Sequence, residues 1–193
     1  MLSLNDVSKK YNKNYALKNI NLEFEKGKLY LLVGENGSGK STLIKLISKV
    51  IFSNEGMINN SFKKVIYLPD HCNYPKLLTV KSYLSLALPN KEDDIISKMK
   101  EYHLDNKLIG SLSKGMQQKL GILQLLISDA DLYLFDEPLD GLDRISVKHF
   151  KNDLNNMIQN GKTIIISTHL RNSFKELNPI IIKFKGGIVN EKK

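Results

Sequence analysis

Short apolar runs alternate with helix-like patterns along this chain, an order that favours an α/β fold with a mainly parallel sheet. Apolar residues that recur every three or four positions predict helices, and continuous or alternating apolar runs predict strands. The expected strands are Leu2–Val7, Asn19–Phe24, Lys28–Val33, Lys64–Leu68, Leu132–Asp136, Thr163–Ser167, Ile180–Lys185 and Ile188–Asn190. The expected helices are Lys40–Ile51, Val80–Leu86, Lys91–Tyr102, Lys114–Ile127 and Ile145–Ile158.

The spacing of these elements predicts one domain over residues 1–193, with two additions to its α/β core. The first three expected strands are separated only by short turns, so we expect a small antiparallel β subdomain beside the core. Residues from about 70 to 111 contain helical patterns but no strand. We therefore expect a short inserted helical subdomain there, with the core formed by residues 1–69 and 112–193.

The composition is that of a globular chain, with 41% hydrophobic and 25% charged residues. No apolar stretch approaches the roughly 20 residues of a membrane span. The N-terminus lacks the pattern of a secretory signal, and a single cysteine, Cys72, cannot form an internal disulfide, so we expect a cytoplasmic protein. The net charge of +9 comes from scattered lysines, with only two arginines. A basic nucleic-acid surface is the weaker interpretation, and no nucleic-acid partner is expected.

A glycine-rich segment between an expected strand and an expected helix matches the phosphate-binding pattern G-x-x-x-x-G-K-[ST]. The pattern predicts a P-loop NTPase core with ATP as ligand, because glycines and a helix N-terminus expose backbone N–H groups to phosphate. Lys40 is expected to reach the β- and γ-phosphates, and Ser41 to ligate Mg²⁺. The alternative is a glycine-rich turn with an incidental lysine. The phosphate loop consists of Gly34, Glu35, Asn36, Gly37, Ser38, Gly39, Lys40, Ser41 and Thr42.

Two acids follow the apolar run Leu132–Phe135 and precede Pro138. A carboxylate at the end of a buried strand, beside a phosphate loop, is typical of a magnesium site. We expect Asp136 to bind Mg²⁺, through water, and Glu137 to be the general base that activates the attacking water. The alternative is that the two acids only terminate the strand.

With these elements in place, the chain resembles the nucleotide-binding subunit of ATP-binding cassette (ABC) transporters over essentially its whole length. Residues 112–119 read LSKGMQQK and resemble the family's signature sequence, whose commoner form is LSGGQ. The resemblance implies that Ser113 and Gly115 contact the γ-phosphate held by a second subunit. Leu139–Asp143 resembles the D-loop, which crosses the dimer interface, and Asp143 matches its terminal aspartate.

Three further residues take their expected roles from the same resemblance. His169 follows the strand at Thr163–Ser167 and resembles the switch histidine that contacts the γ-phosphate. Tyr11 resembles the aromatic residue that stacks on adenine. Asp70 stands where the family usually has a glutamine, and we expect it to keep a role at Mg²⁺. The alternative for Asp70 is that it lies away from the site.

The resemblance implies an ATP-hydrolysing subunit that powers a transporter of the exporter-like branch. Its implied partners are a separate transmembrane subunit and a second ABC subunit, which is either a copy of this chain or a different cassette. Its implied place is the inner face of the cell membrane, as a peripheral protein. The alternative is a soluble ABC ATPase of translation or DNA maintenance, although such proteins carry two cassettes or a coiled-coil insertion that this chain lacks. A scaffold without catalysis is opposed by the presence of both Glu137 and His169.

Overall fold

The computed structural model describes residues 1–170 and 172–192, and its contacts divide the chain into two compact units. The first unit contains Met1–Tyr67, Ala130–Glu137 and the described residues from Asn155 onward. The second unit contains Leu68–Asp129 and Pro138–Leu154. The helical segment expected at about 70–111 lies within this second unit, and so do two further stretches of chain.

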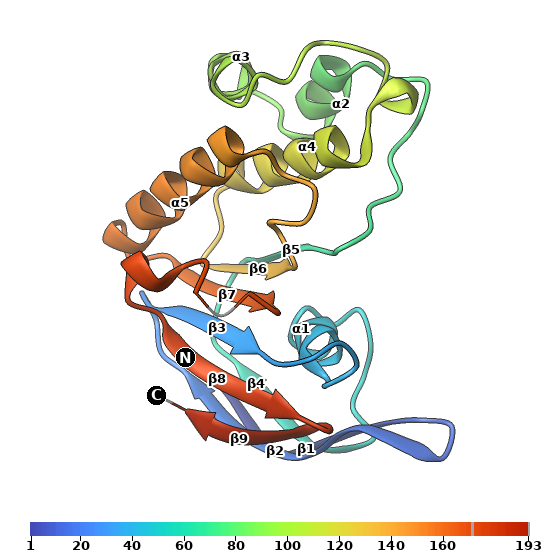
Figure 1. Cartoon of the computed structure of the whole chain (residues 1–193), viewed down its shortest axis with the longest axis vertical. Helices are drawn as coiled ribbons and strands as arrows, with labels where there is room; N and C mark the ends of the chain where they lie inside the picture. Colours follow the sequence, from blue (N-terminus) through green and yellow to red (C-terminus); the bar gives the residue numbers. More distant parts are fainter. Residues whose placement is uncertain (171, 193) are drawn as a thin grey trace. The chain divides into compact units, whose positions relative to one another are not determined.

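A six-stranded sheet of the order β5-β6-β7-β3-β8-β9 contains the parallel strands of the fold (Figure 1). β3 pairs in parallel with β7 and β8, β6 pairs in parallel with β7, and β9 is antiparallel to β8. Every residue of β6 and β7 is buried, which explains their near-continuous apolar sequences. The carboxyl ends of β3, β6 and β7 therefore meet at one edge of the sheet. The strands are β3 (Leu29–Val33), β5 (Val65–Leu68), β6 (Leu132–Asp136), β7 (Thr163–Thr168), β8 (Ile180–Lys185) and β9 (Ile188–Lys192).

The antiparallel sheet has the order β2-β1-β4, from β1 (Leu2–Tyr11), β2 (Asn14–Phe24) and β4 (Glu55–Asn60). Its third strand was expected at Lys28–Val33, and this expectation is wrong. Leu29–Val33 is an almost fully buried apolar run, and it lies between β7 and β8 of the parallel sheet instead. The third position is taken by β4, a largely exposed polar strand.

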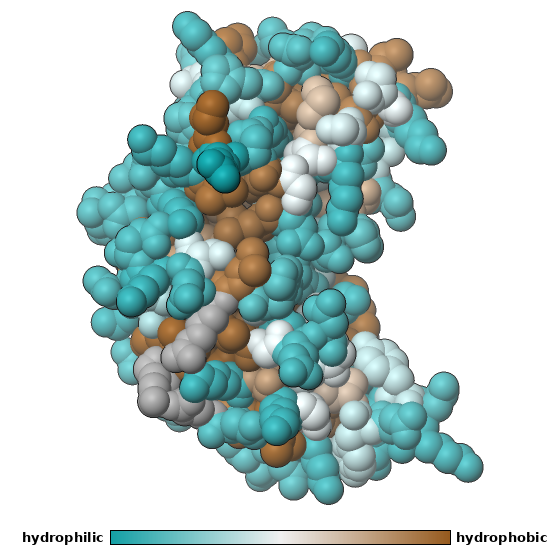
Figure 2. Space-filling model, in the orientation of Figure 1, coloured by the Kyte–Doolittle hydropathy of each residue, from teal (hydrophilic) through white to brown (hydrophobic). Residues whose placement is uncertain are grey.

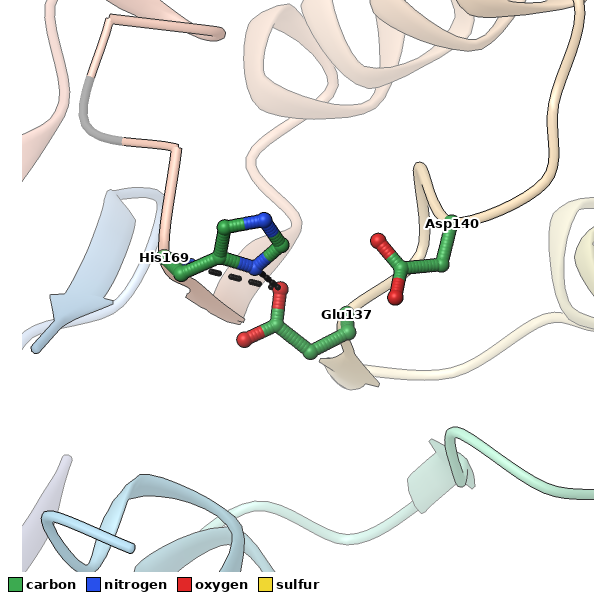
Figure 3. Close-up of side chains that lie close together, drawn as sticks. All are labelled: Glu137, Asp140 and His169. Atoms are coloured by element: carbon green, nitrogen blue, oxygen red, sulfur yellow. Dashed lines mark hydrogen bonds and ion pairs between the residues drawn. The ribbon is translucent and has the colours of Figure 1, made fainter. Parts of the chain in front are cut away.

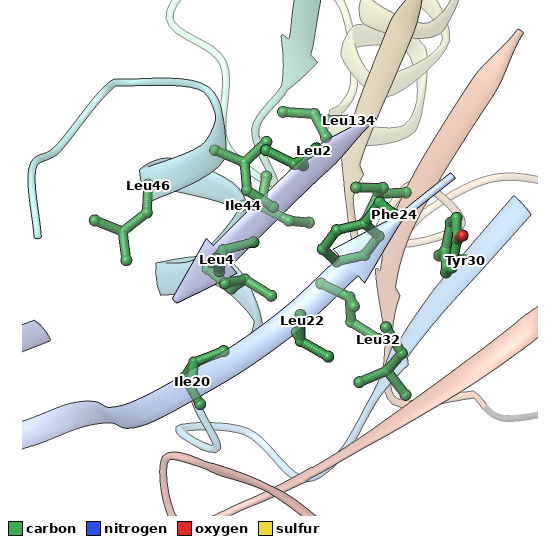
Figure 4. Close-up of a cluster of buried hydrophobic side chains, with 14 of the residues drawn as sticks. Leu2, Leu4, Ile20, Leu22, Phe24, Tyr30, Leu32, Ile44, Leu46 and Leu134 are labelled. Atoms are coloured by element: carbon green, nitrogen blue, oxygen red, sulfur yellow. The ribbon is translucent and has the colours of Figure 1, made fainter. Parts of the chain in front are cut away.

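Helix α1 (Lys40–Ile47) contacts β6 and β7 of one sheet and β2 of the other. The core between these elements is shown in Figure 4, and each large side chain in it contributes about 1.5–3 kcal/mol to folding. The apolar face of α1 thereby holds the helix, and with it the end of the phosphate loop, against both sheets. Labelled core residues are Leu2, Leu4, Ile20, Leu22, Phe24, Tyr30, Leu32, Ile44, Leu46 and Leu134.

The second unit is helical. It contains α2 (Val80–Ala87), α3 (Glu92–Glu101), α4 (Lys114–Ile127), a 3₁₀ turn at Ile109–Ser111, and α5 (Arg144–Gln159) as far as Leu154. α2 contacts α3, and both contact α4. A second 3₁₀ turn, Lys175–Leu177, belongs to the first unit.

Hydrophilic residues cover most of the face drawn in Figure 2. Over residues 1–170 and 172–192, no helix combines the length and the apolar character needed to cross a membrane.

Candidate functional site

The phosphate loop connects β3 to α1, and two of its glycines have no room for a side chain. Gly39 precedes α1 with φ = 105°, a conformation that other residues rarely adopt. A Cβ at Gly39 would lie 2.6 Å from Leu17 Cδ2 and 2.7 Å from the carbonyl oxygen of Ala16. A Cβ at Gly34 would lie 2.5 Å from the carbonyl oxygen of Phe184. The loop is therefore packed directly against neighbouring strands, and the positive end of the α1 dipole lies at its end.

Lys40 folds back over the loop and is almost fully buried. Its Nζ donates to the carbonyl oxygens of Gly34, at 2.8 Å, and Glu35, at 3.1 Å, and lies 3.8 Å from Glu137 Oε1. The hydroxyl of Ser38 is also buried, and it has no hydrogen-bond partner among the described residues. A buried hydroxyl without a partner costs about 1–3 kcal/mol. A ligand that brings acceptor oxygens, such as a phosphate, fits this loop. Glu35, Asn36 and Gly37 are exposed, while Thr42 is half-buried.

A second set of polar groups joins the first turn of α1 to the ends of two strands. The hydroxyl of Ser41 donates to Asp136 Oδ1 at 2.9 Å, and the hydroxyl of Ser167 in β7 donates to the same oxygen. The backbone N–H of Glu137 donates to the carbonyl and hydroxyl oxygens of Ser167, both at 3.2 Å. A hydroxyl and a carboxylate are the hard oxygen donors that Mg²⁺ prefers, so Ser41 and Asp136 fit a magnesium site.

Glu137 and His169 lie against each other where β6 and β7 end (Figure 3). His169 Nδ1 is 3.0 Å from Glu137 Oε2, and the backbone N–H of His169 donates to the same oxygen at 3.3 Å. Glu137 has φ = 47°, a left-handed conformation that costs a non-glycine residue about 1–3 kcal/mol and is concentrated at functional sites. Burial raises the pKa of Glu137, while His169 and Lys40 act to lower it. The result is a basic carboxylate held in one orientation.

Four of the expected site residues lie in the second unit. Ser113 is exposed, and its hydroxyl accepts a hydrogen bond from the N–H of Met116 at 3.3 Å, so it caps α4. Gly115 lies against the D-loop, because a Cβ there would be 2.2 Å from the carbonyl oxygen of Gly141. The remaining two of the four are Asp143 and Asp70.

Asp143 and Asp70 both have partners within the second unit. Asp143 accepts from the N–H of Ser146 at 2.8 Å and pairs with Lys119 Nζ at 2.7 Å. These contacts hold the pKa of Asp143 well below its usual range. Asp70 is half-buried, and its Oδ2 lies 3.3 Å from His71 Nε2.

Tyr11 forms the end of β1 in the first unit and is 48% exposed. Lys9 Nζ lies 5.5 Å from the centre of its ring. Its ring is accessible to a planar ligand.

Two residues with no role predicted from the sequence organise these segments. Ser167 donates to the side chain of Asp136 and accepts from the backbone N–H of Glu137. The sequence could have indicated this role, because Ser167 is a hydroxyl residue near the end of the strand that pairs with β6. Lys119 pairs with Asp143 across 24 residues of sequence. No local pattern could have found that pairing.

A profile of the ABC transporter family matches residues 17–140, a span that includes the phosphate loop, the start of α4 and the two acids. The chain belongs to the ABC transporter family. It is therefore an ATP-binding and ATP-hydrolysing transporter subunit. The alternative of a soluble ABC ATPase outside transport is not favoured, because the relatives described next are transport and export proteins.

Two relatives of this ABC ATPase match along most of their length. The lantibiotic transport ATP-binding protein SrtF of Streptococcus pyogenes is 29% identical over 100% of this chain and 90% of its own. The cytochrome c biogenesis ATP-binding export protein CcmA of Reclinomonas americana is 34% identical over 92% of this chain and 90% of its own.

Solved ABC cassettes share the whole fold. A dimeric ATP-binding cassette in a post-hydrolysis state, bound to ADP and Pi, superposes with a TM-score of 0.90 at 25% identity. The match covers 100% of this chain and 98% of that one. The expected α/β fold with an antiparallel β subdomain is confirmed.

Proposed function

We propose that this ABC ATPase hydrolyses MgATP in a head-to-tail dimer and thereby powers export through a separate membrane subunit. The observation that carries the proposal is the convergence of Lys40, Glu137 and His169 beside the Ser41–Asp136 pair. These groups come from the phosphate loop and from the ends of β6 and β7, all within the first unit.

The phosphate loop supplies binding and charge neutralisation. Lys40 exchanges its carbonyl partners for the β- and γ-phosphate oxygens, and the buried hydroxyl of Ser38 gains an acceptor. Ser41 and Asp136 would hold Mg²⁺, which offsets the charge of the phosphates. The contacts of Ser167 with both Asp136 and Glu137 keep the metal ligand and the base in a fixed relation.

Glu137 is the general base in this mechanism. Its carboxylate takes a proton from the attacking water while the water oxygen bonds to the γ-phosphorus. The bond from the γ-phosphorus to the bridging oxygen breaks, and ADP leaves with that oxygen. Burial makes the carboxylate a stronger proton acceptor, and the contact with His169 fixes its direction.

The second cassette is proposed to complete each site. Ser113 is exposed at the N-terminus of α4, a 14-residue helix, where the helix dipole favours an anion. The family resemblance assigns this segment to the γ-phosphate of the facing subunit, and the solved cassette with ADP and Pi is dimeric. Asp143 and the rest of the D-loop are assigned to the same interface. Tyr11, exposed at the end of β1, is assigned to the adenine ring.

The membrane subunit is proposed to dock near residues 73–80. Leu77 is 90% exposed and Leu108 is 51% exposed, so both apolar side chains are accessible to a partner. Backbone hydrogen bonds from Ile109 to Leu78, at 2.9 Å, and from Gly110 to Lys76, at 3.0 Å, fix the two loops to each other. The export direction follows the name of one relative, the export protein CcmA, and docking would place the chain at the inner face of the membrane.

Replacing Glu137 with glutamine tests the proposal. Glu137→Gln removes the base but keeps the shape of the side chain, so hydrolysis should fall at least about 100-fold while MgATP still binds. Size-exclusion chromatography with light scattering should then detect a dimer that requires ATP. The matched control is Glu25→Gln, the same change at an exposed residue outside the phosphate loop. Hydrolysis at the parent rate by Glu137→Gln would exclude Glu137 as the base.

A further inference from the structure

The D-loop is attached to the first turns of α4 at three points within the second unit. Near its start, the side-chain N–H of the buried Gln118 donates to the carbonyl oxygen of Pro138 at 3.3 Å. In its middle, Gly141 lies so close to Gly115 that no side chain fits between them. At its end, Asp143 pairs with Lys119 at 2.7 Å.

Lys119 differs from the other two attachments because it also reaches a third helix. Its side chain is only 11% exposed, and its Nζ donates to the carbonyl oxygen of Tyr102 at 3.1 Å. Tyr102 is the C-terminal cap of α3, where a cation is favoured by the helix dipole. Asp143 in turn accepts from the N–H and hydroxyl of Ser146 in the first turn of α5. One ammonium group thus connects the end of α3 to the start of α5.

We propose that Lys119 is a positioning residue for hydrolysis, which makes the signature segment and the D-loop move as one body. The proposal rests on the function proposed above, in which both segments meet the nucleotide of the facing cassette. Asp143 is bound by Lys119 and Ser146 of its own chain. The Asp143 carboxylate therefore fixes the conformation of the D-loop in its own chain.

The chemistry of a buried lysine explains why this link depends on the ammonium group of Lys119. A buried ammonium is costly unless its donors are satisfied, and here a carboxylate and a helix-end carbonyl satisfy two of them. Among the described residues, loss of the ammonium leaves Asp143 with the Ser146 contacts, and the D-loop loses the link that Lys119 makes to α3. Gln118 and Gly115 still hold the earlier part of the loop, so the unit itself remains folded.

Hydrogen–deuterium exchange of the nucleotide-free chain tests the proposal without any need for catalysis. Lys119→Met keeps the apolar stem of the side chain and removes its charge. Amides of residues 138–147 should then exchange at least fivefold faster, and Lys119→Arg should restore most of the protection. The matched control is Lys98→Met, which breaks the pairs of Lys98 with Glu101 and Asp153 in the same unit without touching the D-loop. Unchanged exchange at 138–147 in Lys119→Met, or an equal increase in Lys98→Met, overturns the proposal.

Steady-state kinetics provide the second measurement. Lys119→Met should lower kcat about tenfold and leave KM for ATP within twofold, because the phosphate loop is intact. Asp143→Asn keeps an oxygen for the Ser146 N–H but loses the charge. If the two residues act through each other, the double variant should be no slower than the slower single variant. A double variant whose loss of rate equals the product of the two single losses would contradict the proposal. A parent chain without hydrolysis would refute the function proposed above, while the exchange measurement would still decide whether Lys119 holds the D-loop.

Discussion

Replacing Gly115 with alanine sets two physical effects of opposite sign against each other. Gly115 is the second residue of α4, and alanine is favoured over glycine inside a helix by about 1 kcal/mol. Local helix propensity alone therefore predicts a more stable protein. The structure predicts the reverse, because the new methyl group would be built 2.2 Å from the carbonyl oxygen of Gly141.

The size of the clash decides which effect prevails. Non-bonded heavy atoms attract best at about 3.5–4.0 Å, so α4 and the D-loop must separate by on the order of 1 Å. Overpacking of this kind costs about 1–3 kcal/mol, which exceeds or cancels the gain in helix propensity. Gly115→Ala should leave the free energy of unfolding unchanged or lower it by up to about 2 kcal/mol. Hydrolysis should fall more, because a misplacement of about 1 Å can cost roughly 100-fold in rate.

Urea unfolding followed by circular dichroism measures the first effect, and steady-state ATP hydrolysis measures the second. The matched control is Lys114→Ala, which changes the preceding, exposed residue of the same helix without entering the D-loop contact. MgATP binding by the phosphate loop should be unaffected in both variants. If Gly115→Ala unfolds at a higher urea concentration than the parent and hydrolyses ATP at the parent rate, the contact with Gly141 does not limit this position.

The remaining predictions concern protons and the metal. Hydrolysis requires ionised Glu137, so the rate should fall as the pH drops through its raised pKa. His169→Gln removes the largest influence that lowers this pKa, so the acid limb of the single-turnover rate should move to higher pH; a shift to lower pH would contradict the assignment. Asp70→Gln should change the Mg²⁺ concentration needed for half-maximal hydrolysis, and an unaltered Mg²⁺ dependence would mean that Asp70 lies away from the metal.

The elements that carry the chemistry could be predicted because their signals are local. Helix α4 and strands β6 and β8 have the predicted bounds, and the phosphate loop and the two acids were evident from contiguous sequence. A strand that is buried on both faces requires a continuous apolar run, and a phosphate loop requires glycines at fixed positions. Both features can therefore be recognised from a short stretch of contiguous sequence.

One strand of the first unit and the end of one of its helices escaped prediction. The polar sequence EGMINN of β4 has no apolar alternation, and it forms a strand because β1 offers it a partner. Helix α1 was expected to reach Ile51 but ends at Ile47, where Lys49 turns the chain with φ = 61° and Val50 donates to the carbonyl of Lys45. That conformation usually requires glycine, so a lysine gave no stop signal.

Pairings across the sequence were equally hidden. Asp143 was expected in the D-loop at the dimer interface, and its partners within this chain are Lys119 and Ser146, because an α5 N-terminus and a buried ammonium both attract a carboxylate. Its role at the dimer interface stays a prediction. Spacing along the chain could not show that α3, α4 and the D-loop share one charged contact.

The turn between β8 and β9 has a consequence for biosynthesis. The backbone N–H of Gly187 donates to the carbonyl of Ser38 at 3.2 Å, and the Gly187 carbonyl accepts from Lys18 at 2.9 Å. The nucleotide motif is thus translated about 150 residues before the turn that supports it. At roughly 5–20 residues per second, the ribosome needs on the order of 10–30 s to make that stretch. During this interval the nascent chain carries a complete ATP motif but lacks part of its scaffold.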